Sequence, residues 1–211
     1  MLISIDGPDG TGKSTLCKNL VSKLENLGYS AIYTCEPTNS PKGLVLRTHL
    51  QKGDLDKDSM LQLFLEDRKE HLEDFILPMS KKGYIVICDR YKYSTVCYQH
   101  IQGFPLDYLV HANDFAASPD LAIILTLDKD EIISRINGRG LARDIFEQDA
   151  LICKAIEIYE SMQQLFPNEN IIYSNFLGTS QQLLDEIFEL TMPYILKQLN
   201  FEHPQTNDLP R

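Results

Sequence analysis

Five short apolar runs recur at wide intervals along the chain, and each is typical of a strand buried in a sheet. The runs are Leu2–Ile5, Ala31–Thr34, Tyr84–Cys88, Leu121–Leu127 and Asn170–Tyr173. The segments between them repeat apolar residues at the spacing of an amphipathic helix. Strands that alternate with helices pair in parallel and are covered on both faces. The pattern therefore predicts an α/β fold, a doubly wound, five-stranded parallel sheet with helices on both faces.

The longest predicted helix contains one charged residue in its apolar stripe. The helix takes up most of Ser59–Ser80, and one face carries Leu61, Phe64, Leu65, Arg68 and Leu72. A long cation among apolar neighbours has two explanations. Its head can reach an edge and pair with a carboxylate, or it can face a ligand pocket that the helix walls off. The pattern leaves both open.

Length and charge limit the organisation and the partners of the chain. The 211 residues contain no repeat, low-complexity tract or linker, so we expect one domain over residues 1–200. Residues 201–211, with two prolines and few apolar residues, are expected to form a loosely held tail. Thirty acidic and twenty basic residues give a net charge of −10, which disfavours nucleic acid and anionic membranes as partners. An anionic substrate would need a local cluster of Arg and Lys.

The cysteines and the first residues indicate where the protein acts. The five cysteines include no C-x-x-C pair, and an odd number argues against a disulfide framework. The chain opens directly on the first predicted strand, which leaves no room for a cleavable signal peptide. No apolar run approaches the length of a membrane span. We expect a soluble, cytoplasmic protein with reduced thiols.

A phosphate-loop motif follows the first predicted strand. Residues 7–14 fit the pattern G-x-x-x-x-G-K-[ST], and a helical pattern comes next, with Gly28 as its stop. Glycines let backbone N–H groups turn toward a polyphosphate, and the start of a helix adds positive potential. Lys13 is expected to reach the β- and γ-phosphates and Ser14 to hold Mg²⁺. The nucleotide-binding residues predicted here are Gly7, Pro8, Asp9, Gly10, Thr11, Gly12, Lys13, Ser14 and Thr15.

Polar groups also follow the second and third predicted strands. Glu36-Pro37 comes after the second, and Asp89-Arg90 ends the third. Ligands of open α/β sheets bind beyond the carboxyl ends of the strands. An Asp at such a strand end either caps the next helix or holds the magnesium near the phosphate loop. We assign Asp89 and Ser14 to the metal.

Four segments together resemble the thymidylate kinases, which convert dTMP to dTDP with ATP as phosphoryl donor. The resemblance runs from Met1 to Leu196. The segment at 89–99 is close to the D-R-[YH]-x-x-S-x-x-A-Y-Q motif of that family, and the segment at 63–71 to L-F-x-A-D-R-x-x-H. The segment at 119–135 resembles P-D-L-x-[4]-L-D-x-x-x-E, and Glu36-Pro37 with Gly43 and Arg47 resembles R-E-P…G-x-x-[IL]-R. The fold implied is that of a phosphate-loop nucleoside monophosphate kinase with a small lid.

The resemblance implies how the nucleobase and the sugar of the acceptor are recognised. Phe64 would stack on thymine, and Arg68 would donate to the carbonyl at position 4 of the ring. Thr95 and Gln99 would complete the base contacts, and Tyr98 would press on the sugar. An Arg that faces cytosine's amine instead would have no acceptor, which penalises cytidine nucleotides.

The same resemblance assigns the acceptor phosphate and the catalytic groups. Arg47 and Arg90 would grip the monophosphate, and Asp9 would hold the 3′-hydroxyl of the sugar. The implied catalytic residues are Lys13, Arg90, Arg143 and Asp9. The implied acceptor-binding residues are Asp9, Glu36, Pro37, Arg47, Phe64, Arg68, Arg90, Ser94, Thr95, Tyr98 and Gln99. These kinases are usually homodimers, which we expect here too.

A basic, glycine-containing segment over residues 135–147 resembles the lid of these kinases. Its glycines would give the backbone the freedom to close. Arg135 resembles the arginine that packs on adenine. Arg139 or Arg143 would reach the transferred phosphoryl group, and Arg143 is the better match. A solvated surface loop is the alternative.

One departure from the family and several rival functions stay open. Cys35-Glu36-Pro37-Thr38-Asn39 stands where the family has R-E-P-G-G, close to the acceptor phosphate, so the acceptor could be dUMP or another deoxynucleoside monophosphate. A nucleoside kinase would need a general base, and two arginines favour a phosphorylated acceptor. A regulatory GTPase would carry N-K-x-D, which the sequence lacks. A non-catalytic nucleotide-binding partner would be expected to have lost Lys13, Asp89 or the lid arginines.

Overall fold

The protein, described by a computed structural model over residues 1–138, 146 and 148–202, is built on one parallel sheet. The spatial order of the strands is β2-β3-β1-β4-β5, and all four neighbouring pairs are parallel. Their bounds are β1 Leu2–Asp6, β2 Ala31–Cys35, β3 Ile85–Asp89, β4 Leu121–Leu125 and β5 Ile171–Ser174. Every strand expected from the apolar runs is present, so the predicted fold class is confirmed.

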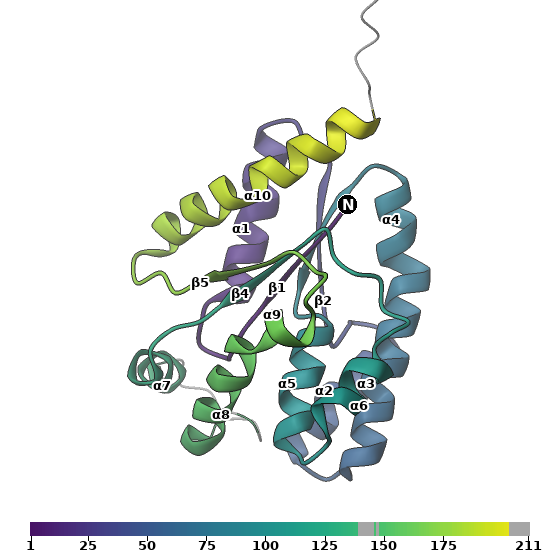
Figure 1. Ribbon diagram of the computed structural model, residues 1–211, viewed down its shortest axis with the longest axis vertical. Coiled ribbons are helices and arrows are strands. Elements are labelled where there is room, and N and C mark those ends of the chain that lie inside the picture. Colours follow the sequence, from purple (N-terminus) through teal and green to yellow (C-terminus); the bar gives the residue numbers. More distant parts are fainter. Residues whose placement is uncertain (139–145, 147, 203–211) are drawn as a thin grey trace, which may run out of the picture.

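Helices cover both faces of the sheet, as Figure 1 shows, with α1 and α10 together on one side. The helices are α1 Lys13–Asn26, α2 Pro41–Lys52, α3 Lys57–His71, α4 Leu77–Lys81, α5 Lys92–Ile101, α6 Leu106–Ala112, α7 Lys129–Gly138, α8 Asp149–Glu160, α9 Met162–Leu165 and α10 Ser180–Glu202. Successive strand residues point to opposite faces. Ile3 and Ile5 pack with α1 and α10, while Leu2 and Val86 belong to the core on the other face. This is why the strands read as unbroken apolar runs.

The predicted helix over Ser59–Ser80 is interrupted by one wider turn. Between α3 and α4, residues Leu72–Ile76 form a π-helical segment labelled η1. Pro78 has no backbone N–H, and its ring would clash with the backbone oxygen four residues back if a regular α-helix continued into α4. Just before it, the N–H of Leu77 donates to the carbonyl of Leu72, five residues back. A proline in the first turn of α4 therefore accounts for the change of helix type.

The strand register brings three loops to one edge of the sheet. Ile5 of β1 and Cys35 of β2 both lie beside Asp89, the last residue of β3. The phosphate loop, the segment that starts at Glu36 and the turn at Arg90 therefore leave the sheet side by side. β1 lies between β3 and β4, where the order of the strands reverses and where open α/β sheets bind ligands.

Two predicted segments lie partly outside the described residues. The proposed lid begins at Arg135, but residues 135–138 are the last turn of α7 and not a glycine-loosened loop. Arg139 and Arg143 are not among the described residues. α10 continues to Glu202, two residues into the predicted tail. Within the described ranges, each helix is too short or too polar to traverse a lipid bilayer.

Candidate active site

The loop between β1 and α1 has a backbone that favours glycine. Gly7, Gly10 and Gly12 have φ angles of 135°, 87° and 89°. At Gly7 a side chain would also collide with β4, because a Cβ atom there would lie 2.2 Å from the backbone oxygen of Leu125. α1 starts at Lys13, directly after Gly12. The loop and the positive end of the helix dipole therefore face the same space, as anion binding requires.

That space is a cavity of about 320 Å³. It is lined by Asp9, Gly10, Gly12, Lys13, Ser14, Thr15 and Arg90. The Nζ atom of Lys13 donates to the backbone oxygen of Pro8 at 2.6 Å. Burial lowers the pKa of Lys13 to about 8, and the nearby charge of Arg90 acts in the same direction. Burial thus disfavours the charged form of Lys13. A polyanion bound beside it and beside the backbone N–H groups would favour that charged form.

A hydroxyl and a carboxylate meet at the edge of this cavity. Ser14 Oγ donates to Asp89 Oδ2 at 2.5 Å, although the two residues come from α1 and β3. The phenol of Tyr33 in β2 donates to the same carboxylate oxygen at 3.3 Å. Hydroxyl and carboxylate oxygens are the ligands that Mg²⁺ prefers. These donors fit a magnesium ion, and Asp89 accepts bonds from two other elements instead of capping the helix that follows it.

The turn after β3 holds Arg90 in an unusual conformation. Arg90 has a φ of 69°, and within the described chain it is the one non-glycine residue with a positive φ. The buried carboxylate of Asp6 accepts bonds from the backbone N–H groups of Tyr91 at 3.0 Å and Ser94 at 3.2 Å. It also accepts the Ser94 hydroxyl at 2.7 Å. Burial raises the pKa of Asp6 despite these bonds. Strain and desolvation are thus concentrated where Arg90 is placed, which is common at functional sites.

The guanidinium of Arg90 connects the phosphate loop to α5. It donates to Asp9 Oδ1 at 2.5 Å, to the backbone oxygen of Gly7 at 3.3 Å and to Ser94 Oγ at 3.1 Å. It also lies over the ring of Tyr98, 5.3 Å from the ring centre. The hydroxyl of Tyr98 donates to the other oxygen of Asp9 at 3.2 Å. One cation therefore orients the acid of the loop and an aromatic wall together.

A second cavity of about 320 Å³ adjoins the phosphate loop. Its lining includes ten of the eleven residues predicted to bind the acceptor: Asp9, Glu36, Pro37, Arg47, Phe64, Arg68, Arg90, Ser94, Thr95 and Tyr98. They come from the loops that follow β1, β2 and β3 and from α2, α3 and α5, so only the fold brings them together. Asp9, Ser14 and Arg90 line both cavities. The two spaces therefore meet at these three side chains.

Gln99 is the predicted acceptor residue that does not line this cavity. Its side chain is fully buried in α5, and neither its amide nitrogen nor its amide oxygen has a partner among the described residues. A buried side-chain amide without a hydrogen bond lowers the stability of the folded protein. It lies one turn beyond Thr95, which does line the cavity, on the same face of α5.

The position of Arg68 agrees with both explanations left open by the sequence, pairing with a carboxylate and facing a ligand pocket. Only 1% of it is exposed, and it lines the acceptor cavity. Its Nε and Nη2 atoms donate to Glu36 Oε2 at 2.9 and 2.6 Å. Its other contacts are Asn113 Oδ1 at 2.5 Å and Thr95 Oγ1 at 3.0 Å. Arg68 therefore pairs with a carboxylate and also faces the cavity, because a planar guanidinium has donors on several sides.

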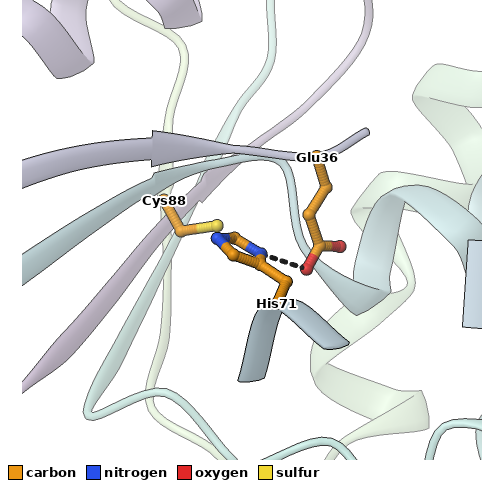
Figure 2. Close-up of side chains that lie close together, drawn as sticks. All are labelled: Glu36, His71 and Cys88. Atoms are coloured by element: carbon orange, nitrogen blue, oxygen red, sulfur yellow. Dashed lines mark hydrogen bonds and ion pairs between the residues drawn. The ribbon is translucent and has the colours of Figure 1, made fainter. Parts of the chain in front are cut away.

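Glu36, which pairs with Arg68, lies together with His71 and Cys88, as Figure 2 shows. Among the described residues they are the group of His, Cys and acidic side chains whose ligand atoms lie within 4.8 Å of one another. Each already has a partner. His71 Nδ1 is 3.0 Å from Glu36 Oε1, and the Cys88 thiol donates to the backbone oxygen of Arg90 at 3.1 Å. Burial raises the pKa of Cys88 well above its usual value, so the group is better described as a hydrogen-bonded cluster than as a metal site.

Arg47 reaches the acceptor cavity from α2. Its guanidinium donates to the backbone oxygens of Pro37 and, at 3.4 Å, Thr38. Its Nη2 atom lies 3.3 Å from the sulfur of Cys35, the residue that replaces the arginine of the family motif. Arg47 thus holds the segment after β2 while its head remains in the cavity lining. The position of Cys35 supplies no cation of its own.

Arg135 lies near the other side of the phosphate loop. It forms an ion pair with Glu131 one turn earlier in α7, with 2.6 Å between Nε and Oε1. A third cavity, of about 140 Å³, is lined by Arg135, by Thr11 and Gly12 of the loop and by Phe176 and other residues after β5. The residue predicted to pack on adenine therefore shares a cavity with the phosphate loop.

Sequence reasoning gave no role to several residues of the site. Tyr33, Asn113, Tyr159, His71 and Phe146 all contact the predicted residues or line the acceptor cavity. His71 ends the motif at residues 63–71, but the motif alone does not indicate which residues the imidazole contacts. Asn113 lies outside every motif, and a lone Asn near the end of a short helix carries no signal. Their roles come from long-range contacts.

Comparison with known proteins agrees with this geometry. The family model described as thymidylate kinase matches residues 5–186. A thymidylate kinase of Xanthomonas campestris pv. campestris (strain B100) is 41% identical over 172 residues, which cover 82% of this chain and 75% of that protein. One from Xylella fastidiosa (strain 9a5c) is 36% identical over 172 residues, 82% of each chain. A probable thymidylate kinase of Pyrococcus horikoshii is 36% identical over 200 residues, 92% of this chain and 97% of that one. With a phosphate loop, a cation-lined acceptor cavity and these relatives, the chain belongs to the thymidylate kinase family of nucleoside monophosphate kinases.

Proposed function

We propose that the protein transfers the γ-phosphoryl group of ATP to dTMP, giving dTDP and ADP. The observation that carries this proposal is the junction of two cavities. Asp9, Ser14 and Arg90 line both the phosphate-loop cavity and the cavity that contains Phe64 and Arg68. A nucleotide on the loop would therefore present its terminal phosphate to a second phosphate held on the other side of Arg90.

The acceptor cavity suits a pyrimidine that carries a carbonyl opposite Arg68. Phe64 provides an aromatic surface for the base, and Tyr98 lies beside Asp9 where the sugar would bind. A cytosine would place an amine against the guanidinium, which leaves buried donors unpaired and costs binding. The three relatives described above all carry the thymidylate name, and none of them favours the dUMP alternative.

The chemistry requires positioning and charge more than a general base. The acceptor is already an oxyanion, so no proton has to be removed from it. Catalysis then consists of holding two mutually repelling anions in line and neutralising the group in transit. We assign this work to Lys13 and Arg90, with Arg47 on the acceptor phosphate. Arg139 or Arg143 of the lid would complete the set, and both lie outside the described residues.

Ser14 and Asp89 are the residues that would hold magnesium. When bound there, Mg²⁺ would supply positive charge to the β- and γ-phosphates of ATP. Tyr33 fixes the Asp89 carboxylate from β2, which keeps its oxygens aimed at the Ser14 hydroxyl. This arrangement of protein oxygens is the support for a magnesium requirement.

The wider organisation also belongs to this proposal. We propose one kinase domain over residues 1–200, with a lid at residues 135–147 and a tail at 201–211, assembled as a homodimer and acting on nucleotides and not on nucleic acid. None of the five cysteines forms a disulfide in the described part of the chain, which is typical of a reducing compartment and supports a cytoplasmic location.

A coupled ADP assay tests the function directly. The purified protein with Mg-ATP is offered dTMP, dUMP, dCMP, UMP and dGMP in parallel, and also no acceptor. We expect the highest kcat/KM with dTMP, and little ADP when no acceptor is present. Comparable values for dUMP and dTMP would support the alternative acceptor. ADP release that does not depend on any acceptor would contradict the kinase assignment.

A further inference from the structure

The guanidinium that faces the acceptor base is held by a carboxylate that is itself held from behind. Glu36 Oε2 accepts two hydrogen bonds from Arg68, at 2.9 Å from Nε and 2.6 Å from Nη2. Its other oxygen, Oε1, receives His71 Nδ1 at 3.0 Å. The side chains of Arg68, Glu36 and His71 are all at most 4% exposed. These three side chains are therefore largely shielded from bulk water.

The partners of His71 define its orientation and its tautomer. An ionised Glu36 can only accept a hydrogen bond, so Nδ1 must carry the proton. The other ring nitrogen, Nε2, is 2.6 Å from the hydroxyl of Thr34 in β2. Phe75 stacks on the imidazole with 5.9 Å between ring centres. His71 is thus fixed on three sides, by Glu36, Thr34 and Phe75. Figure 2 shows its contact with Glu36.

The charge of Glu36 depends on both neighbours. Burial alone would raise the pKa of this carboxyl, but Arg68 and His71 together hold it below the usual range. A carboxylate with one oxygen bound and one free could rotate and release the guanidinium. The bond from His71 removes that freedom, because it fixes the second oxygen.

We propose that His71 is a positioning residue for base recognition: it fixes Glu36, and Glu36 aims Arg68 at the carbonyl of the acceptor base. This inference rests on the proposed function. His71 touches neither substrate in this scheme. It acts on the choice between pyrimidines, because an Arg68 that is free to move can turn away from the amine of cytosine, and so loses part of its power to reject it.

Amide substitutions separate this role from a purely structural one. In His71→Asn the amide nitrogen takes a place close to that of Nδ1 and can still donate to Glu36. In His71→Gln the amide reaches toward the place of Nε2 and can bond only to Thr34. The two variants are matched in polarity and are close in size. His71 also borders a cavity of about 360 Å³, so both smaller and flexible side chains have room there.

The experiment measures kcat and KM for dTMP, dCMP and ATP in wild type, His71→Ala, His71→Asn and His71→Gln, with melting temperatures of each. In His71→Ala we expect the KM for dTMP to rise about tenfold, since a bond to a charged group is lost. The ratio of kcat/KM between dTMP and dCMP should fall by a similar factor. The KM for ATP should not change. His71→Asn should recover most of the ratio, and His71→Gln should resemble His71→Ala.

Two results would overturn the inference. One is an unchanged dTMP to dCMP ratio in His71→Gln, whatever happens to the melting temperature. The other is equal recovery by His71→Asn and His71→Gln, which would indicate packing alone. If His71→Ala does not fold, the two amide variants still decide. Failure of the proposed function would appear differently, as a wild-type protein that does not prefer dTMP.

Discussion

The pKa of Lys13 depends on its burial and on the charges that surround it. Burial lowers its pKa to about 8, with a further contribution from the charge of Arg90. The carboxylates of Asp9 and Asp89 act in the opposite direction but do not cancel this effect. A polyphosphate bound against Lys13 would favour the charged form and raise the pKa. Nucleotide binding and protonation of Lys13 are therefore linked.

This linkage predicts proton uptake when Mg-ATP binds at alkaline pH. At pH 8.5 much of Lys13 in the ligand-free protein is neutral, and binding should return its proton. At pH 7 Lys13 is already charged, so this uptake should be nearly absent. The affinity for Mg-ATP should fall as the pH rises through about 8. Titration calorimetry in two buffers of different ionisation enthalpy measures the protons taken up.

Lys13→Arg is the control for this prediction, because a guanidinium stays charged over the whole range. It should bind Mg-ATP without proton uptake at pH 8.5. Equal uptake by wild type and Lys13→Arg would show that another group is responsible. No uptake by the wild type would mean that the pKa of Lys13 is not depressed.

At the level of elements, the phosphate loop depends on its close approach to β4. Gly7 combines a φ of 135° with a position where a Cβ atom would lie 2.2 Å from the Leu125 backbone oxygen. Gly28, at the end of α1, has a φ of 88° and no heavy atom within 4 Å of such a Cβ. Both glycines have a positive φ that disfavours other residues, but only at Gly7 would a side chain also collide with a neighbouring backbone.

Replacing each glycine by alanine separates the two requirements. Gly28→Ala should lower the free energy of unfolding by about 1 kcal/mol, the cost of a left-handed alanine. Gly7→Ala should cost several times more, because two backbones must move apart, and it should abolish nucleotide binding. Urea denaturation measures both. Similar losses of unfolding free energy in the two variants would mean that β4 can move away at little cost in stability and that its close approach to Gly7 is not essential.

At the level of the whole molecule, Arg90 joins segments that lie far apart in the sequence. Its guanidinium contacts Gly7 and Asp9 of the phosphate loop and Ser94 of α5. In a protein with a net charge of −10, the junction of the two cavities is where cations gather. Arg90 belongs to both cavities, so under the proposed function its charge would act on donor and acceptor together.

Arg90→Ala should lower kcat at least about a hundredfold, the size of effect seen when one preorganised donor is removed. The protein should stay folded, because Asp9 is partly exposed and water can replace its partner. Arg90→Gly is the matched control: it should be equally inactive but about 1 kcal/mol more stable than Arg90→Ala, since glycine accepts the positive φ without strain. Kinetics and urea denaturation check both. Near wild-type turnover in either variant would contradict the role of Arg90.

Local pattern was enough to predict the architecture and the position of the phosphate loop between β1 and α1. Each strand is a short apolar run, and the three central strands β3, β1 and β4 are buried along their whole length. Such runs need no distant information to be recognised. The phosphate loop is contiguous, so its glycines, Lys13 and Ser14 could be placed from spacing alone. Resemblance to the family added the acceptor residues, ten of which line one cavity.

The contacts among those residues could not be foreseen, because they join positions far apart in the chain. Asp6 shapes the turn at Arg90 across 85 residues, and Arg68 finds Asn113 across 45. The π-helical turn before Pro78 and the helical start of the proposed lid also depend on local geometry that periodicity does not resolve. Apolar periodicity specifies which faces are buried. The partners of each buried polar group are chosen only when the sheet order sets the loops side by side, since a hydrogen bond requires atoms within about 3 Å.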